Sequence, residues 1–332
     1  MKKNDTAVRA RIIATGSSVP ERVVRNSDLE KIVDTSDEWI TERTGIRERR
    51  IAREDQTTSD LACEAAKQAL KQADLKAKDI DLIVIGTVTP DMPFPSTACL
   101  VQHRLEAKNA AAFDVSAACS GFIYALATAD SFIRAGTHKR VLVIGAETLS
   151  KFVDWEDRTT CVLFGDGAGA VVLEAAAGDY GILSTHLYAD GSLWEMLNIP
   201  GGGSKNPPSR ETLKDRLHCI KMKGNETFKI AVRSLEGLVT ETLRANRLKP
   251  SQLTALIPHQ ANLRIIKATA ERAGLPLDKV VINLDRYGNT SSASIPIALD
   301  EAVRTGRVRA GDYILLEAFG GGLTWASALI RW

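Results

Sequence analysis

The sequence lacks the features that mark membrane proteins, disulfide-bonded proteins and nucleic-acid-binding proteins. No apolar run in its 332 residues approaches the roughly 20 residues that a membrane span requires, and residues 1–5 lead into no apolar core of an export signal. The five cysteines form neither CxxC pairs nor a zinc-ligand spacing, which favours a reducing compartment and predicts no metal site. The net charge of +2 provides no overall attraction for nucleic acid. We therefore expect a cytoplasmic protein that binds neither membranes nor nucleic acid.

The chain does have the composition and rhythm of a folded α/β protein. It is 44% hydrophobic and 25% charged, and it is long enough for one large domain or two fused ones. Short β-branched runs alternate with longer helical patterns, which is typical of α/β folds. The pattern predicts strands at residues 81–85, 111–115, 140–144, 170–174, 279–283 and 312–316, and helices near residues 59–73, 119–135, 226–245 and 262–273. Residues 199–208 are rich in glycine and proline, so we expect a surface flap there.

The two halves of the chain resemble each other. At an offset of 173, six positions match through a predicted helix, turn and strand: Leu70, Leu75, Lys76, Ile80, Ile83 and Val84 align with Leu243, Leu248, Lys249, Leu253, Leu256 and Ile257. Cys119 precedes Gly136 by 17 residues, and Asn289 precedes Gly306 by the same 17, so we expect Asn289 to occupy the position that Cys119 occupies in the first half. This repetition predicts a duplication, with halves at residues 1–175 and 176–332 and the chemistry at their interface.

Cys119 stands where the strand at residues 111–115 turns into an apolar helix. The first-turn amides of a helix are unpaired donors with partial positive charge, so we expect them to push the thiol toward thiolate and to bind an oxyanion beside it. A free cysteine is more often a small core residue, and Cys63, Cys99, Cys161 and Cys219 fit that simpler interpretation.

Two polar residues far downstream complete an acyl-transfer centre with Cys119. His259 lies in Pro258-His259-Gln260-Ala261-Asn262, and Asn289 lies in Gly288-Asn289-Thr290-Ser291-Ser292. Taken singly, His259 could be a loop histidine and Asn289 a turn or helix cap. Because each of the three stands between a strand and a helix, their combination favours catalysis.

These motifs resemble those of β-ketoacyl-[acyl carrier protein] synthase III, the enzyme that initiates type II fatty acid synthesis. The resemblance runs from Ile12 to the C-terminus and includes the segments at residues 114–122, 164–170, 258–262, 288–291 and 319–325. It implies the thiolase fold, a duplicated five-layer α-β-α-β-α arrangement, and a homodimer. No metal or redox cofactor is implied, since a CoA thioester is itself the substrate.

The resemblance also implies a mechanism. Cys119 attacks a short acyl-CoA, most simply acetyl-CoA, and the backbone N–H groups of Cys119 and Gly321 hold the oxyanion. His259 and Asn289 then donate to the thioester oxygen of malonyl-[acyl carrier protein] while carbon dioxide leaves. The resulting carbanion attacks acyl-Cys119 and gives a 3-oxoacyl-[acyl carrier protein].

Substrate-binding residues follow from the same resemblance. Those expected to bind CoA are Thr35, Trp39, Arg43, Arg158, Asn225 and Asn262, with Trp39 and Arg158 stacking on the adenine. Phe94, reaching across the dimer, and Leu163 are expected to shape the acyl pocket. Those expected to bind the acidic carrier protein are Arg264, Lys229, Lys267 and Arg272. On residues alone, Trp39 could equally anchor a helix to the core, and the lysines could be a solvated helix face.

Other interpretations remain open at this point. One is a condensing relative from secondary metabolism that uses another acyl-CoA or acceptor; a second is a Cys-His-Asn amide hydrolase with His259 as base; a third is an inactive scaffold. The glycines at residues 165–169 lead into a predicted strand, so a phosphate-binding loop is not expected there. Ala326 stands where the family usually has glycine, which costs little if the backbone there is extended.

Overall fold

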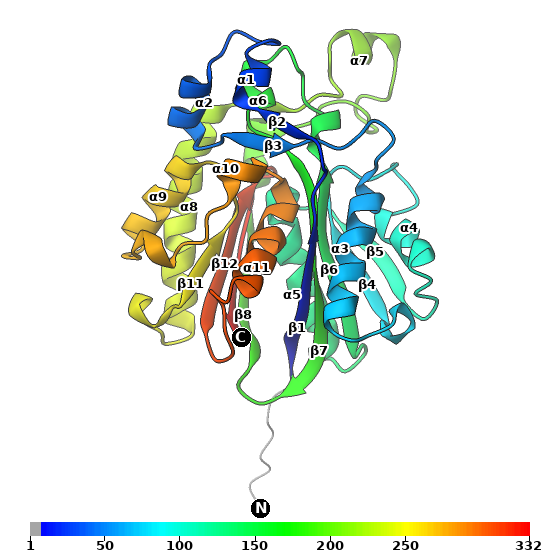
Figure 1. Ribbon diagram of the computed structural model, residues 1–332, viewed down its shortest axis with the longest axis vertical. Coiled ribbons are helices and arrows are strands. Elements are labelled where there is room, and N and C mark those ends of the chain that lie inside the picture. The colour runs from blue at the N-terminus through cyan, green and yellow to red at the C-terminus, as the bar shows by residue number, and fades with distance from the viewer. Residues whose placement is uncertain (1–7) are drawn as a thin grey trace, which may run out of the picture.

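The computed structural model describes residues 8–332, which form two β-sheets with helices between and outside them (Figure 1). Residues 1–7, which include the segment expected to carry no export signal, lie outside the described residues. No helix among residues 8–332 is both long enough and apolar enough to cross a membrane.

The first sheet belongs to the N-terminal half. Its strands, in spatial order, are β1 (Val8–Ser18), β7 (Asp166–Ala177), β6 (Arg140–Thr148), β4 (Leu82–Gly86) and β5 (Ala111–Val115). Strands β4, β5 and β6 run parallel, while β7 is antiparallel to both β6 and β1. Strand β4 is buried along its whole length, which explains its continuous run of apolar residues. The strand predicted after the glycines at 165–169 is confirmed, since those glycines open β7 itself.

The second sheet repeats this order, but its fifth strand is reduced to a single bridge. It contains β11 (Ala255–Pro258), β12 (Tyr313–Gly320), β13 (Thr324–Arg331) and β8 (Gly181–Ala189). The strand predicted at residues 279–283 is wrong: a 3-10 turn occupies Leu277–Lys279, and a single bridge joins Val280 to Leu256. The N–H of Asn283 donates to the side chain of Gln260, from another part of the chain, rather than to a neighbouring strand.

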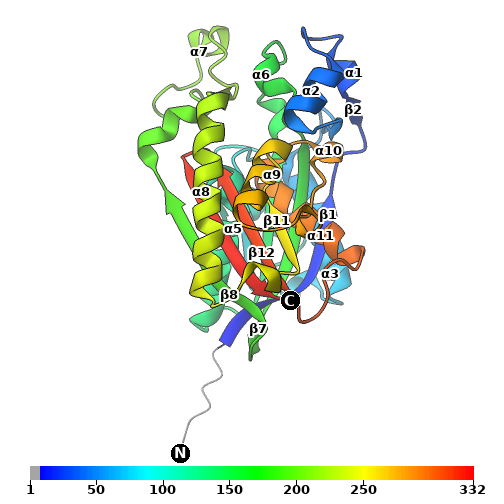
Figure 2. The ribbon, with the colours of Figure 1, turned by 90° about the vertical axis from the view of Figure 1, so that its left-hand side faces the viewer.

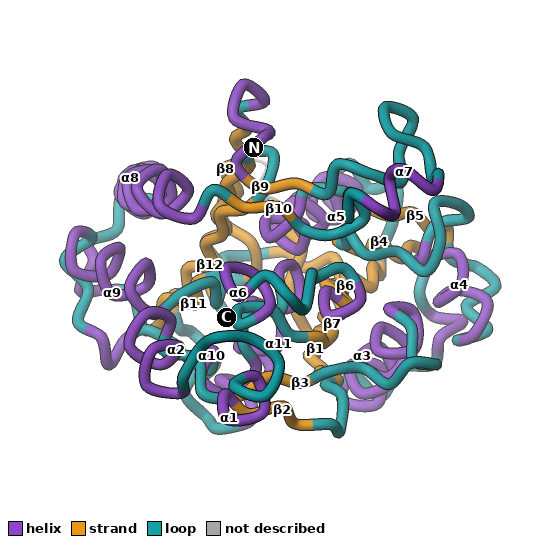
Figure 3. Tube along the Cα trace, turned by 90° about the horizontal axis from the view of Figure 1, so that it is seen from above, coloured by secondary structure: helices purple, strands orange, loops and turns teal. Residues whose placement is uncertain are grey.

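Helices separate and cover the sheets in five layers, as the resemblance implied (Figures 2 and 3). On the outside of the first sheet lie α3 (Thr58–Gln72) and α4 (Thr97–Arg104), and on the outside of the second lie α8 (Gly224–Ala245) and α9 (Leu263–Arg272). Between the sheets lie α5 (Gly121–Arg134) and α11 (Ser294–Arg304). The central core therefore draws Phe122 and Leu126 from α5, and Ile295 and Leu299 from α11.

Smaller elements complete the fold, and most of them lie toward the upper end of the molecule in Figure 1. They are β2 (Val23–Arg25), α1 (Asn26–Leu29), α2 (Asp37–Thr44), β3 (Glu48–Arg50), α6 (Arg158–Cys161), β9 (Leu197–Asn198), α7 (Arg210–Lys214), β10 (Lys221–Met222) and α10 (Leu284–Tyr287). The predicted flap at residues 199–208 has no helix or strand and lies between β9 and α7. Arg216, just after α7, forms ion pairs with Asp154 and Glu156, which fastens the far end of this segment.

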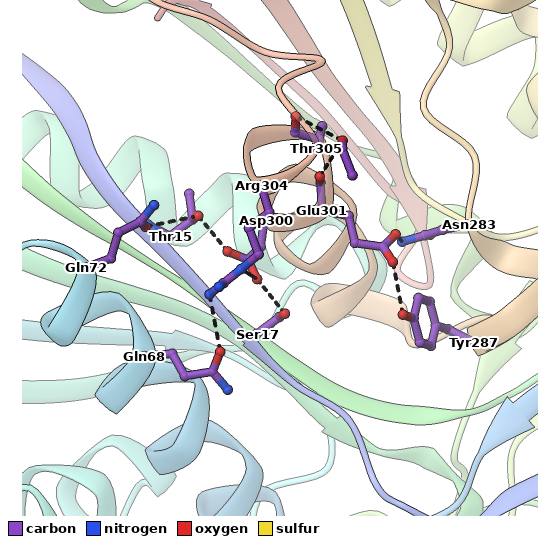
Figure 4. A network of polar contacts seen from close by, with 11 residues as sticks. Thr15, Ser17, Gln68, Gln72, Asn283, Tyr287, Asp300, Glu301, Arg304 and Thr305 are labelled. Carbon is purple, nitrogen blue, oxygen red and sulfur yellow. Dashed lines mark hydrogen bonds and ion pairs between the residues drawn. The ribbon is translucent and has the colours of Figure 1, made fainter.

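A buried polar network fixes α11 against its surroundings (Figure 4). The carboxylate of Asp300 accepts hydrogen bonds from the hydroxyls of Thr15 and Ser17 on β1, each at 2.6 Å, and pairs with Arg304 at 2.9 Å. On the next position of the helix, Glu301 accepts from Asn283 at 2.7 Å and from Tyr287 at 3.0 Å. Helix α11 is therefore tied on one side to the first sheet and on the other to the segment before Asn289.

The two halves correspond, but the expected equivalence of Cys119 with Asn289 is wrong at the start of the helices. Ala118 (φ 46°) and Ser291 (φ 48°) each open a 3-10 turn directly before a central helix, and they are 173 residues apart. The helices end at Arg134 and Arg304, which are only 170 apart, because α11 is three residues shorter than α5. Cys119 therefore corresponds to Ser292, and the equal spacing of 17 arose from the shorter helix. The boundary between halves at residues 175 and 176 stays a prediction.

Candidate active site

Cys119 lies in the 3-10 turn Ala118–Ser120, between the end of β5 and the start of α5. Only 5% of its surface is exposed. The backbone of β12 approaches it so closely that a Cβ on Gly320 would lie 2.6 Å from the nitrogen of Cys119. Glycine is therefore required at position 320 because the strand of one half packs against the nucleophile of the other.

Burial decides the protonation of this thiol. It raises the pKa of Cys119 to about 11, while the side chain of Ser291 and the backbone N–H groups of Cys119 and Gly321 act in the opposite direction. The expectation that the helix start would make the group a thiolate is thus wrong, because desolvation of the charged form outweighs the donors. The same two N–H groups are those expected to form the oxyanion hole.

A cavity of about 340 Å³ opens onto Cys119. Its wall is mainly apolar and draws on both halves and on the base of the flap; its residues include Val88, Leu149, Phe164, Leu197, Ile199, Ile220, Ser291, Gly321 and Thr324. Leu163, which was expected here, is not among the lining residues and packs half-buried in the outer core, so the wall is formed by its neighbour Phe164. Phe94 is 84% exposed on the surface of the single chain.

His259 follows the last residue of β11 and is buried. Its backbone N–H donates to the carbonyl of Glu317 on β12 at 2.7 Å, and its ring Nδ1 lies 2.7 Å from the hydroxyl of Ser294. Burial lowers the pKa of His259 to about 3, so the ring is neutral at physiological pH. A neutral imidazole can donate one hydrogen bond and is a weak base here.

Asn289 is held by both its backbone and its side chain. Its backbone N–H donates to the carbonyl of Leu163, and its own carbonyl accepts from the N–H of Gly165. The side-chain oxygen accepts from the N–H of Ser291 at 2.9 Å. Because the acceptor end of the amide is occupied, its NH₂ group remains as the donor. The segment from Asn289 to Ser294 thus joins Asn289, the cavity residue Ser291 and the partner of His259.

The residues expected to bind CoA are partly brought together. The guanidinium groups of Arg43 and Arg158 lie over the indole of Trp39, at 5.0 and 5.2 Å from the ring centroid. Asn262 caps α9 and donates to the carbonyl of Arg43 at 3.0 Å, which adds it to this cluster. Thr35 lies close by in sequence, and its hydroxyl has no hydrogen-bond partner among residues 8–332. Asn225, in the first turn of α8, is exposed, and within the described part of the chain it forms no hydrogen bond with this cluster.

The residues expected to contact a carrier protein lie on α8 and α9, which pack against each other. All four are exposed: Lys229 on α8, and Arg264, Lys267 and Arg272 on α9. Arg264 lies over the ring of Phe228 at 5.3 Å. Arg272 forms an ion pair with Glu236 at 3.0 Å, so its charge is partly compensated.

Several residues of this region gave no signal in the sequence. Ser294 reaches His259 across 35 residues, and Gln260 uses all its polar atoms to join Pro258, Val281 and the start of α10. Such contacts depend on the fold rather than on a local motif. Ala326, by contrast, is explained: it lies in β13, buried and without a positive φ, so alanine fits the extended backbone.

Comparisons with known proteins agree on one family. Residues 113–191 match 3-oxoacyl-[acyl-carrier-protein (ACP)] synthase III, and residues 243–332 match its C-terminal part. A β-ketoacyl-[acyl-carrier-protein] synthase III of Xanthomonas campestris pv. campestris is 61% identical over 325 residues, covering 98% of this chain and 99% of the relative. The one from Caldanaerobacter subterraneus subsp. tengcongensis is 58% identical over 325 residues, covering 98% of each.

Solved structures support the same conclusion. The 3-oxoacyl-[acyl-carrier-protein] synthase III from Aquifex aeolicus VF5 matches with a TM-score of 0.91 and 55% identity, covering 97% of this chain and 100% of that one. The priming β-ketosynthase of the R1128 polyketide pathway is as similar in shape, with a TM-score of 0.90, but only 36% identical, covering 97% of this chain and 95% of that one. The five-layer duplicated architecture is accordingly the thiolase fold, and the chain belongs to the β-ketoacyl-[acyl-carrier-protein] synthase III family.

Proposed function

We propose that this protein catalyses the initiating condensation of type II fatty acid synthesis. A short acyl-CoA, acetyl-CoA in the simplest case, and malonyl-[acyl carrier protein] give a 3-oxoacyl-[acyl carrier protein], CoA and carbon dioxide. The observation that carries the proposal is a cavity that opens onto the buried thiol of Cys119 and includes Ser291 in its wall. The segment from Asn289 to Ser294, which contains Ser291, holds both the amide of Asn289 and the neutral ring of His259. Sequence identity of 58% and 61% to two curated β-ketoacyl-[acyl-carrier-protein] synthase III enzymes supports the proposal.

In the first half-reaction Cys119 attacks the acyl-CoA carbonyl. The C–S bond to CoA breaks, CoA leaves as the thiol with the proton of Cys119, and the acyl group remains on the sulfur. The N–H groups of Cys119 and Gly321 stabilise the tetrahedral oxyanion. They already act on the sulfur in the free protein, where both favour its charged form. The apolar wall around Phe164 and Leu197 suits a short acyl chain.

In the second half-reaction malonyl-[acyl carrier protein] loses carbon dioxide. The electron pair of the breaking C–C bond passes into the thioester enolate, whose oxygen accepts from the ring N–H of His259 and the NH₂ of Asn289. The enolate carbon then attacks the acyl carbonyl on Cys119, and the C–S bond breaks to release the product. The thiolate of Cys119 takes up one proton from solvent. The reaction therefore requires donors rather than a base.

The alternative function, a Cys-His-Asn amide hydrolase, would need His259 as a base for the thiol of Cys119. Burial raises the pKa of Cys119 to about 11 and lowers that of His259 to about 3, and both shifts disfavour transfer of the thiol proton to the imidazole. The condensing relative of secondary metabolism is not favoured either, because the polyketide priming synthase is only 36% identical while a β-ketoacyl-[acyl-carrier-protein] synthase III reaches 61%.

The substrate contacts complete the proposal. Trp39, Arg43, Arg158 and Asn262 would bind the nucleotide of CoA, with Thr35 and Asn225 beside it, and Arg264, Lys229 and Lys267 would meet the acidic carrier protein. Exposure of 84% of Phe94 supports a homodimer in which this ring enters the partner's acyl pocket. Free thiols at all five cysteines support the expected cytoplasmic location.

Intact-protein mass spectrometry tests the proposal. After incubation with acetyl-CoA, the wild type should gain one acetyl group and Cys119→Ser should gain none. A chase with malonyl-[acyl carrier protein] should remove the acetyl group, release carbon dioxide and give acetoacetyl-carrier protein. Discharge to a CoA ester alone would identify the secondary-metabolism relative, whereas discharge to water would identify a hydrolase.

A further inference from the structure

We propose that the hydroxyl of Ser294 is the positioning group that fixes the tautomer of His259, holding Nδ1 as acceptor and the ring hydrogen on Nε2. Ser294 begins α11 and is buried, with 2% of its surface exposed. Its Oγ lies 2.7 Å from Nδ1 of His259, and this is the one hydrogen bond that the His259 ring makes among the described residues. The inference deepens the proposed function, on which its catalytic part rests.

The direction of this hydrogen bond follows from counting donors and acceptors. The backbone N–H of Gln260 donates to Oγ of Ser294 at 3.3 Å, so the hydroxyl oxygen already has a donor. Within residues 8–332, Nδ1 of His259 is the one acceptor within reach of the hydroxyl hydrogen. If Nδ1 carried the hydrogen instead, the hydroxyl hydrogen would be buried without an acceptor, which is unfavourable. The hydroxyl therefore donates, and a neutral ring that accepts at Nδ1 carries its hydrogen at Nε2.

The acceptor atoms of the His259 and Asn289 side chains are then occupied in the same way. The N–H of Ser291 occupies the acceptor end of the Asn289 amide, and the O–H of Ser294 occupies the acceptor nitrogen of His259. In each side chain the end that remains is an N–H donor. Both occupying groups come from the short segment between Asn289 and Ser294, so one piece of backbone orients both donors toward a developing enolate.

The support of Ser294 is rigid. It begins α11, whose later turn is fixed by the hydrogen bonds of Asp300 to Thr15 and Ser17 on β1 (Figure 4). At the other end of the contact, the backbone of His259 is bonded to the carbonyl of Glu317. A hydrogen bond between two such fixed groups loses little conformational freedom when it forms. Ser294 can therefore set the tautomer and ring angle of His259 without touching the substrate.

The first test reads the tautomer directly. Long-range ¹H–¹⁵N correlation spectra of protein labelled with ¹⁵N-histidine distinguish a ring that is protonated at Nε2 from one that is protonated at Nδ1, and His259→Ala assigns the signal among the five histidines. The wild type should show His259 protonated at Nε2. Ser294→Ala should convert this signal to a mixture of tautomers, and Ser294→Thr, which retains a hydroxyl, should restore it. This measurement needs no substrate.

The second test separates the half-reactions. Ser294→Ala should slow the release of carbon dioxide from malonyl-[acyl carrier protein] by about ten-fold or more, because the ring N–H of His259 would then donate to the enolate oxygen in only part of the molecules. Any loss in the acylation of Cys119 by acetyl-CoA should be at least about five-fold smaller, because acylation does not use the His259 donor. Ser327→Ala is the matched control: it removes a fully buried hydroxyl whose hydrogen-bond partner is the side chain of Thr242 and not that of His259, and it should leave the His259 signal unchanged.

Three results would overturn the inference: a wild-type ring protonated at Nδ1, a Ser294→Ala spectrum identical to that of the wild type, or equal losses in both half-reactions. Failure of the proposed function looks different. If the wild type released no carbon dioxide from malonyl-[acyl carrier protein] while Ser294→Ala still changed the tautomer, the role of Ser294 toward His259 would stand and the condensing reaction would fall.

Discussion

Glu317 allows a sharp prediction about stability, because it is a carboxyl group buried without compensation. It lies in β12 with 1% of its surface exposed, and neither of its carboxylate oxygens has a hydrogen-bond partner among the described residues. Burial alone raises its pKa from 4.5 to about 8. At neutral pH the folded protein therefore keeps this group protonated, whereas the unfolded chain ionises it.

The direction and size of the effect follow from proton linkage. Between pH 4.5 and pH 8 the folded state binds one more proton than the unfolded state at this site, so stability falls as pH rises through that window. A pKa difference of about 3.5 amounts to about 5 kcal/mol over the whole range, of which about 4 kcal/mol lies between pH 5 and pH 9. Glu317→Gln has nearly the same shape and cannot ionise. Relative to the wild type, the variant should therefore gain about 4 kcal/mol in free energy of unfolding between pH 5 and pH 9.

Urea denaturation of Glu317→Gln and wild type at pH 5 and pH 9, at one protein concentration, measures how the stability difference between the two proteins changes with pH. Glu38→Gln is the matched control, because it makes the same chemical change on an exposed residue and should shift stability equally at both pH values. A stability difference between Glu317→Gln and wild type that stays constant from pH 5 to pH 9 would refute the reasoning. It would mean that the carboxyl group finds partners that stabilise its charge.

Three further predictions concern the site and its support. Alkylation of Cys119 by iodoacetamide, followed by peptide mass spectrometry, should accelerate about ten-fold per pH unit from pH 7 to pH 10, because its pKa is about 11; a plateau near pH 8 would contradict this. Arg264→Glu should raise KM for malonyl-[acyl carrier protein] about ten-fold at low salt and less at high salt, whereas Arg272→Glu, whose charge Glu236 already offsets, should change it less in steady-state assays. Asp300→Ala should lower the free energy of unfolding by about 2 kcal/mol in urea, since it removes the carboxylate that accepts from the buried hydroxyl of Thr15 and the half-buried hydroxyl of Ser17, and an unchanged midpoint would contradict the role given to this network.

Much of the fold could be predicted because its central strands and helices carry local patterns. Strand β4 has an unbroken apolar run and α8 a long helical one, and both formed where the sequence placed them. The segment at residues 279–283 has the same apolar pattern as β4, yet it makes one bridge only. What decided its structure was the side chain of Gln260, about twenty residues earlier, which takes the N–H groups of Asn283 and Leu284. Local pattern does not reveal competition of this kind.

The candidate site also has features that the sequence indicates and features that only the fold reveals. Cys119 and His259 stand between a strand and a helix, as the sequence indicated, and their catalytic roles stay predictions. Asn289 does not, because it lies between α10 and the 3-10 turn Ser291–Ala293. The protonation of Cys119 and His259 could not be predicted, because it depends on how completely the fold excludes water: the pKa of Cys119 moved up and that of His259 moved down for the same reason. Ser294 was invisible for another reason, since a serine at a helix start is ordinary until a histidine is found 2.7 Å away.

The duplication explains why the nucleophile and its two helpers come from different halves. Each half delivers a 3-10 turn with a positive φ to the start of a central helix, at Ala118 before α5 and at Ser291 before α11. The first turn presents the thiol of Cys119. The second presents the N–H of Ser291, which holds Asn289, and leads directly into Ser294 of α11, whose hydroxyl contacts His259. Because the two helices lie together between the sheets, the two turns meet. A change that displaces the start of α11 should therefore weaken both donors together, whereas the backbone of Cys119 is held by the other turn, before α5.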